Sequence, residues 1–293
     1  KIDYEEQTPA VTIDDGIHCV GGPMFPEKNS NVMCELFCEK GRPMDEVFAE
    51  ADEVFEETIE TPYQEHVHLE TNSAIADMED GKFVFYASAQ CPFYIRKFIA
   101  GLLDIPYDDI IVRQCTTGGA FGGKEDFTCQ PHAALAAYLL GRPVKVRLSR
   151  PESIRMHPKR HGMKLHYVIG CDEKGILQAA KVRIIADTGA YASAGGPVVT
   201  RTGTHATSAY HIPSVDVHVK AVFTNNLPAG AFRGFGVNQS NFAMECLIDE
   251  LCETGGFARW QFRYDNAVAP GRMVTTGQVL GEGTALRETL LAV

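Results

Sequence analysis

The order of strand-like and helix-like segments is the feature that most limits the fold of this chain. In the first half the two patterns alternate, because a strand-like stretch at 82–90 is followed by a helical stripe that starts at Pro92. In the second half strands dominate, and residues 163–169 and 176–186, joined by a turn of sequence DEKG, predict a β-hairpin. Elements that first alternate and then segregate indicate an α+β fold with mixed sheets and packed helices.

The same patterns place the remaining elements. The stripe after Pro92 consists of Ile95, Phe98, Ile99, Leu102 and Leu103. Further strands are expected at 110–113, 144–148 and 215–224, and further helices at 128–140 and 239–253. Residues 19–46 mix Gly, Pro, Asn and charged residues, so we expect an extended connector there.

Charge and cysteine content exclude several classes of protein. The net charge of −11 argues against nucleic-acid binding, which needs a basic surface for counterion release. No stretch approaches the ~20 apolar residues of a membrane span, and the first ten residues lack the features of a signal peptide. The nine cysteines form no C-x-x-C pair, and their odd number predicts reduced, buried thiols in a cytoplasmic protein.

A glycine-rich loop, GGAFGGKE at 118–125, lies between an expected strand and an expected helix. It nearly matches the phosphate-binding loop of nucleotide hydrolases, but Glu125 stands where that loop needs Ser or Thr to hold magnesium. We therefore reject a nucleotide hydrolase. Glycines still let the backbone approach a ligand closely and direct N–H groups at anionic or metal-bound oxygens. The alternative is a tight turn without a ligand.

A second motif, AFRGFG at 231–236, places two aromatic residues around an arginine. Such a segment can present a guanidinium to an anion and a ring face to a planar ligand, although ordinary packing also produces it. His157 and His161 have the H-x-x-x-H spacing of some zinc ligands. Their basic stretch contains no carboxylate partner, so we expect a surface or packing role for this pair.

Taken together, eight segments resemble the molybdenum-binding region of the xanthine dehydrogenase and aldehyde oxidase family of molybdenum hydroxylases, in family order and with family-like spacing. They are QEHVHLET at 64–71, ASAQ at 87–90, TTGGAFGGKE at 116–125, GRPVKVRLSR at 141–150, TGAYAS at 188–193, YHIP at 210–213, TNNLPAGAFRGFGVNQ at 224–239 and TGQVLGEG at 276–283.

This resemblance implies a domain organisation. Residues 1–18 would be the terminal strand of a preceding domain, and 47–293 the first of the family's two molybdenum-cofactor-binding domains, with lobes near 47–150 and 151–293. The second cofactor-binding domain, which carries the general-base glutamate, would belong to a partner domain or subunit. Iron–sulfur clusters and FAD would also lie on partners. We therefore expect the isolated chain to be inactive.

The resemblance also implies the cofactor site. The family holds molybdenum through the dithiolene of a pterin, so no protein metal ligand is expected. Gln90 would lie beside the apical oxo group of the metal, and Arg233 at the cofactor. The implied cofactor-binding residues are Gln90, Gly119, Ala120, Phe121, Gly122 and Arg233. Ala120 replaces the glycine that is commonest in the family. The cofactor is molybdopterin, and its cytosine dinucleotide form stays open.

Three residues would face the substrate. By resemblance, Glu125 and Arg201 clamp a purine-like nitrogen heterocycle, and the ring of Phe235 stacks on it. Gln90, Glu125 and Arg201 would be the catalytic residues of a hydroxylation that uses oxygen from water. Three alternatives remain: a structural Glu125–Arg201 salt bridge, a nicotinate-type or aldehyde-oxidising enzyme, and a non-catalytic partner-binding subunit without cofactor.

Overall fold

The computed structural model describes residues 2–293, which form two compact units. The first unit contains the residues up to 62, together with 161–226 and 234–293. The second contains 63–160 and a short return segment, 227–233. These bounds differ from the lobes expected near 47–150 and 151–293, because the chain crosses between the units more than once.

The first unit is built on a five-stranded mixed sheet. Its strand order is β1 (Val32–Lys40), β9 (Ser214–Phe223), β8 (Leu177–Gly189), β7 (Gly162–Cys171), β2 (Glu53–Thr61). Only β8 and β9 run parallel, and the other neighbours are antiparallel. The predicted hairpin is confirmed, since β7 and β8 pair directly through the turn at 172–175.

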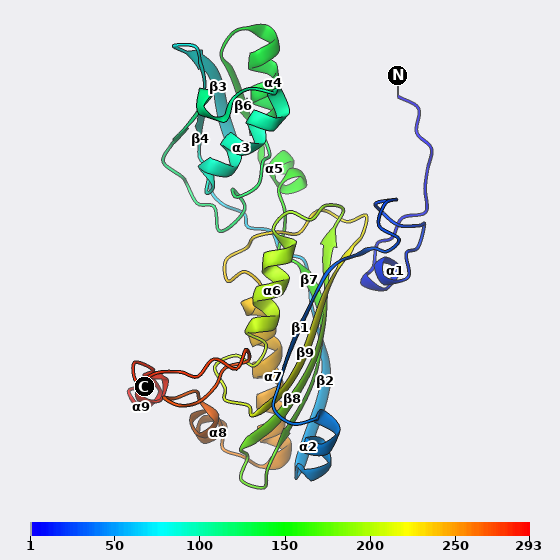
Figure 1. The fold of residues 1–293 in the computed structure, drawn as a ribbon, viewed down its shortest axis with the longest axis vertical. Coiled ribbons are helices and arrows are strands. Elements are labelled where there is room, and N and C mark those ends of the chain that lie inside the picture. Colours follow the sequence, from blue (N-terminus) through cyan, green and yellow to red (C-terminus); the bar gives the residue numbers. More distant parts are fainter. Residues whose placement is uncertain (1) are drawn as a thin grey trace. The chain divides into compact units, whose positions relative to one another are not determined.

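Helices cover one face of this sheet. Figure 1 shows α6 (Gly195–Thr204) and α7 (Val237–Gly255) side by side along the strands, with α8 (Arg259–Asn266) next to α7. The core between helices and sheet is apolar and includes Tyr167 and Leu247, which are completely buried. Three short helices complete the unit: α1 (Ile13–Ile17), α2 (Met44–Glu50) and α9 (Leu286–Leu291).

The second unit has a four-stranded sheet with the order β5 (Ile110–Gln114), β4 (Lys82–Ala87), β3 (Ser73–Glu79), β6 (Val144–Arg147). Two helices, α3 (Pro92–Leu103) and α4 (Gln130–Leu140), pack on it, and α5 (Arg150–Met156) and the 3₁₀ turn η1 (Tyr107–Asp109) lie in its connections. Since β4 and β5 are parallel, the segments that follow them leave the sheet at the same edge. Gln90 follows β4 and the glycine-rich loop follows β5.

Two expectations about the N-terminal part were wrong. Residues 2–18 contain a helix, α1, rather than a strand, because Thr12 and Asp15 form a capping box that starts it. The expected connector 19–46 contains β1 and the start of α2. In β1 the apolar positions that pack on the core are occupied partly by Cys34 and Cys38, and charged residues alternate with them, which masked the strand pattern.

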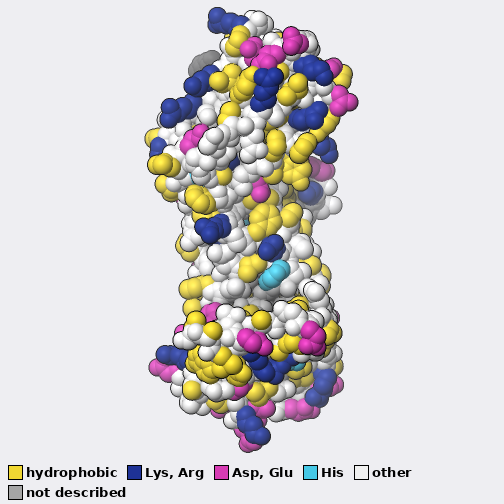
Figure 2. Space-filling model, turned by 90° about the vertical axis from the view of Figure 1, so that its left-hand side faces the viewer, with side chains coloured by type: hydrophobic (Ala, Val, Ile, Leu, Met, Phe, Trp, Pro, Cys, Tyr) yellow, Lys and Arg dark blue, Asp and Glu magenta, His cyan; other side chains and the backbone are white. Residues whose placement is uncertain are grey.

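Two expectations from the sequence concern membrane-spanning helices and cysteines. No helix among residues 2–293 is long and apolar enough to span a membrane. All nine cysteines are free. Cys129, Cys171 and Cys252 are buried as expected, whereas Cys115 is exposed. On the face shown in Figure 2, acidic and basic side chains are interspersed.

Candidate active site

Gln90 joins the two segments that leave the edge of the second unit's sheet. Its side-chain Oε1 accepts hydrogen bonds from the backbone N–H groups of Gly122 (2.9 Å) and Lys124 (3.3 Å). Its own backbone N–H donates to the Lys124 carbonyl at 2.9 Å. Because two backbone donors fix the amide oxygen, Nε2 is left as a donor, and it makes no hydrogen bond within residues 2–293.

The glycine-rich loop presents a row of unpaired backbone donors. Gly123 N–H donates to the Ala120 carbonyl, and Glu125 N–H donates to the Gly122 carbonyl. The N–H groups of the three residues at 119–121 make no hydrogen bond in the described chain. Phe121, with φ of 57°, lies between the positive-φ residues Gly119 and Gly122. Successive free N–H groups in such a loop form a concave site for an anion or a ligand oxygen.

An ion pair between the buried Lys124 and the partly exposed Glu70 supports this loop. Lys124 is buried, and its Nζ lies 2.6 Å from Glu70 Oε2. The same carboxylate accepts the backbone N–H of Gly118 at 2.9 Å. Burial alone would raise the pKa of Glu70, but the hydrogen bonds from Lys124 and Gly118 lower it below its usual value. Since Lys124 points inward to Glu70, it does not serve as a phosphate-binding lysine.

The second motif also contacts the loop. Arg233 N–H donates to the Phe121 carbonyl at 2.9 Å, and the Arg233 carbonyl accepts from the Arg160 guanidinium at 2.9 Å. Arg160 also lies over the ring of Phe232, 3.9 Å from its centroid. The Arg233 side chain itself is exposed and has no partner among the described residues, so it is available to an anion. A backbone hydrogen bond between Arg233 and Phe121 therefore joins the glycine-rich loop to the second motif.

Glu125, at the end of the loop, is half-buried and forms no ion pair within its unit. Burial raises the pKa of its carboxyl, and the neighbouring charge of Asp126 raises it further. A carboxyl with a raised pKa can share a proton with a basic ring nitrogen more readily than an ordinary one.

Arg201 and Phe235 belong to the first unit. Arg201 lies in the last turn of α6, and Phe235 immediately precedes the N-cap of α7. Both line an open groove of about 710 Å³, which is also bordered by Cys34, Glu35 and His205. The Arg201 guanidinium is exposed and has no ion-pair partner within its unit. The structure therefore brings Arg201 and Phe235 together, and separately brings Gln90, the loop and Arg233 together.

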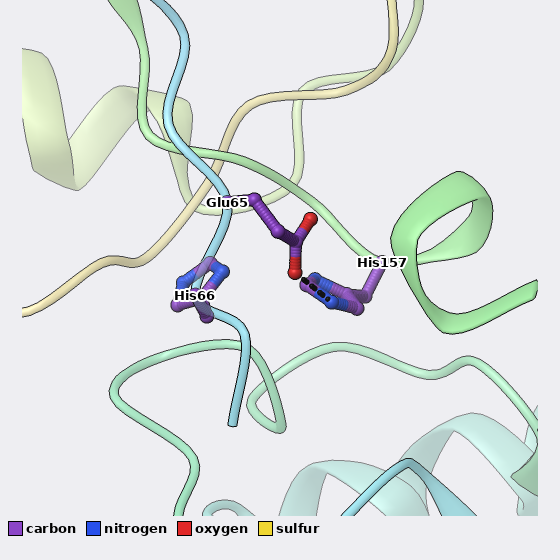
Figure 3. A group of neighbouring side chains, drawn as sticks. All are labelled: Glu65, His66 and His157. Carbon is purple, nitrogen blue, oxygen red and sulfur yellow. Dashed lines mark ion pairs between the residues drawn. The ribbon is translucent and has the colours of Figure 1, made fainter. Parts of the chain in front are cut away.

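The expectation for His157 was wrong in one respect. This histidine is completely buried, and its Nε2 lies 2.8 Å from Oε1 of Glu65, a carboxylate from a distant part of the sequence. Figure 3 shows the two side chains together with His66. His161 is also buried, so a surface position is excluded for both. The lack of an acidic residue near His157 in the sequence did not exclude a carboxylate partner, because Glu65 lies 92 residues earlier in the chain.

Sequence reasoning did not assign roles to Glu70 and His66, although both lie in the QEHVHLET segment. His66 Nε2–H donates to the Ala231 carbonyl at 2.8 Å, and its ring stacks on Phe232 with centroids 4.0 Å apart. The sequence did offer a signal for these roles. Four ionisable residues lie close together in one loop, between the isolated bridge at Gln64 and strand β3. These side chains hold the loop and the second motif in place.

Comparison with known proteins gives a family match. Residues 24–267 match the model of the molybdopterin cofactor-binding domain. The chain is 41% identical over 244 residues to a Bacillus subtilis protein named as a probable xanthine dehydrogenase subunit, covering 83% of this chain and 33% of that protein. It is 37% identical over 287 residues to the nicotinate dehydrogenase large molybdopterin subunit of Eubacterium barkeri, covering 98% and 64%.

The fold matches a solved structure over its whole length. The aldehyde oxidoreductase from Desulfovibrio gigas superposes with a TM-score of 0.95 and 28% identity, covering 100% of this chain and 32% of that chain. This confirms the α+β assignment. The chain spans between about one third and two thirds of the length of the two curated relatives above.

Proposed function

This chain belongs to the family of molybdopterin cofactor-binding domains, and we propose that it supplies part of the pocket of a molybdenum hydroxylase that acts on a nitrogen heterocycle. The observation that supports cofactor binding is the row of free N–H groups at 119–121 beside the free Nε2 of Gln90. Five donors, counting the Arg233 guanidinium as one, are suited to a ligand with several anionic oxygens. The residues present therefore fit a molybdopterin.

Each of these groups has a definite task in the proposed reaction. When bound, molybdopterin supplies the redox chemistry by which oxygen from water enters the substrate and two electrons leave. The loop N–H groups and Gln90 Nε2 hold oxygens at fixed positions without reorganisation, as an oxyanion hole does. Arg233 neutralises an anionic part of the cofactor. The second cofactor-binding domain, the iron–sulfur clusters and FAD are proposed on partners, and so we expect the isolated chain to be inactive.

Glu125 and Arg201 are the proposed determinants of the substrate class. The two curated relatives above are named for xanthine and nicotinate, both nitrogen heterocycles. A carboxyl with a raised pKa and an unpaired guanidinium can each form a charge-assisted hydrogen bond to such a ring as charge develops on it. Phe235 adds an aromatic face for stacking.

The alternative substrate class is an aldehyde, which the likeness to the Desulfovibrio gigas enzyme favours. An aldehyde offers one reacting carbonyl and cannot use two separated ring contacts. The two classes are therefore distinguished by how much each depends on Glu125 and Arg201.

The test is the ratio of kcat/KM for a heterocycle and for a simple aldehyde in the assembled enzyme. Glu125→Val or Arg201→Met removes a charge-assisted hydrogen bond worth roughly 1.5–3 kcal/mol, about one to two decades in rate. Heterocycle turnover should fall by that order and aldehyde turnover much less. Arg259→Met, which removes an exposed arginine paired only with surface acids, is the control. An unchanged ratio in both test variants would show that the pair is structural.

A further inference from the structure

Three ionisable side chains converge in the second unit at a point that the proposed reaction does not use. Glu65 and His66 lie in the segment before β3, and His157 directly follows α5. One ligand atom from each lies within 4.8 Å of the others. Figure 3 shows the carboxylate between the two imidazole rings. His157 is completely buried, and 7% of the His66 surface is exposed.

The backbone fixes which ring nitrogens face this point. His66 Nε2 lies 2.8 Å from the Ala231 carbonyl, and His157 Nδ1 lies 3.0 Å from the Pro158 carbonyl. A carbonyl only accepts, so these two nitrogens carry the hydrogens. His66 Nδ1 and His157 Nε2 therefore keep their lone pairs, and neither buried atom makes a hydrogen bond. Histidine ligands of metals typically donate their other N–H to a backbone carbonyl or carboxylate in this way.

Glu65 completes the set. Its Oε1 accepts a hydrogen bond from the Val67 N–H at 3.3 Å and lies 2.8 Å from His157 Nε2. Two electron-rich atoms therefore approach closely and need a positive charge that both can reach. Lys159 Nζ lies 2.9 Å from the other oxygen, Oε2, and donates to the His157 carbonyl, so it does not occupy the space beside Oε1.

We propose that Glu65, His66 and His157 bind one divalent cation of the zinc class. Two neutral imidazoles and one carboxylate are a donor set that zinc accepts, with a fourth position left to water. The three donors are not among the residues proposed to hold molybdopterin, although His66 contacts Ala231 and Phe232 of the second motif. Because His66 also holds the Ala231 carbonyl, the ion would stiffen the contact between this segment and the return segment 227–233.

The experiment uses the full chain, stripped with EDTA, equilibrated with zinc chloride and freed of excess metal. We expect about one zinc per chain by elemental analysis and a higher thermal midpoint than in the stripped protein. His157→Asn and Glu65→Gln should each lose the zinc and the shift of the midpoint. His132→Gln, an exposed histidine of the same unit, should keep both.

The variant Lys159→Met should change zinc affinity in the opposite direction to His157→Asn and Glu65→Gln. Removing a positive charge next to the carboxylate should tighten zinc binding by about tenfold or more. Far-UV circular dichroism of each stripped variant checks that it is folded, and a variant that is unfolded is replaced by His66→Gln for the same comparison. The proposal is overturned if the wild type retains no zinc, in which case a proton joins Glu65 and His157, or if His157→Asn retains as much zinc as the wild type.

Discussion

Alanine substitutions at Gly122 and Gly119 can measure how much the contact between the glycine-rich loop and the Ala231 carbonyl contributes to stability. Both have positive φ, 103° and 85°. A Cβ added at Gly122 would lie 2.3 Å from the Ala231 carbonyl oxygen and 2.9 Å from Phe232 Cα, which are backbone atoms. A Cβ added at Gly119 would find its nearest neighbour at 3.4 Å, an atom of the Phe121 ring. The two Gly→Ala variants share backbone strain, and Gly122→Ala adds a collision.

The structure sets the expected magnitudes. Left-handed backbone costs an alanine roughly 1–2 kcal/mol, partly offset by ~0.4–1 kcal/mol from the reduced freedom of the unfolded chain. Gly119→Ala should therefore destabilise the second unit by about 1 kcal/mol. Gly122→Ala must also displace the Ala231 carbonyl, and the buried N–H of His66 then loses its acceptor, at ~1–3 kcal/mol. Its total should be about 2–4 kcal/mol.

Hydrogen exchange measured by mass spectrometry gives the free energy of opening for peptides of 63–160 and 227–233. The single tryptophan, Trp260, lies in the first unit, so its fluorescence during urea unfolding is an internal control that should not change. Equal costs for the two variants would refute the reasoning, because they would mean that the loop does not rest on the Ala231 carbonyl.

Three further variants test the residues that support the loop. Gln90→Leu removes the acceptor of two backbone N–H groups and should destabilise the second unit by ~1–3 kcal/mol in the same assay, whereas Gln90→Glu keeps an acceptor and should restore the stability while the molybdenum content of the assembled enzyme stays low. Lys124→Met removes the partner of Glu70, whose pKa is lowered in the folded chain. The wild type should therefore lose this stability only as pH falls below about 4.5, whereas Lys124→Met should be less stable at pH 7 and change less between pH 5 and 3 when urea midpoints are compared.

Local patterns were sufficient to predict the elements near the site. Pro92 marks the start of α3, and the two long alternating segments joined by a DEKG turn are the hairpin of β7 and β8. The apolar stripe on α3 is only partly buried. Ile95 and Ile99 lie in the core, whereas Phe98 is 37% exposed. Periodicity shows which face is apolar but not how much of it another element covers.

The supports of the site could not be predicted in this way, because they join residues far apart in the sequence. The Lys124–Glu70 pair spans 54 residues, and the His66–Ala231 hydrogen bond spans 165. Lys124 also lies in a motif that suggests an exposed phosphate ligand, and although Glu125 argues against a nucleotide hydrolase, the sequence does not show that Lys124 is buried against Glu70. The unit boundaries were missed for the same reason, since nothing local in 227–233 shows that it returns to the second unit.

The return segment constrains the order in which the second unit can form during protein synthesis. Residues 63–160 leave the ribosome first, yet the Phe121 carbonyl, His66 Nε2 and the Arg160 side chain all have partners within 231–233. Until those residues emerge, the nascent unit has polar groups without their partners, and the glycine-rich loop lacks its contact with residues 231–233. A fragment cut at residue 160 should therefore be a target for proteases, and a fragment that is meant to contain the second unit should include 227–233 as well as 63–160.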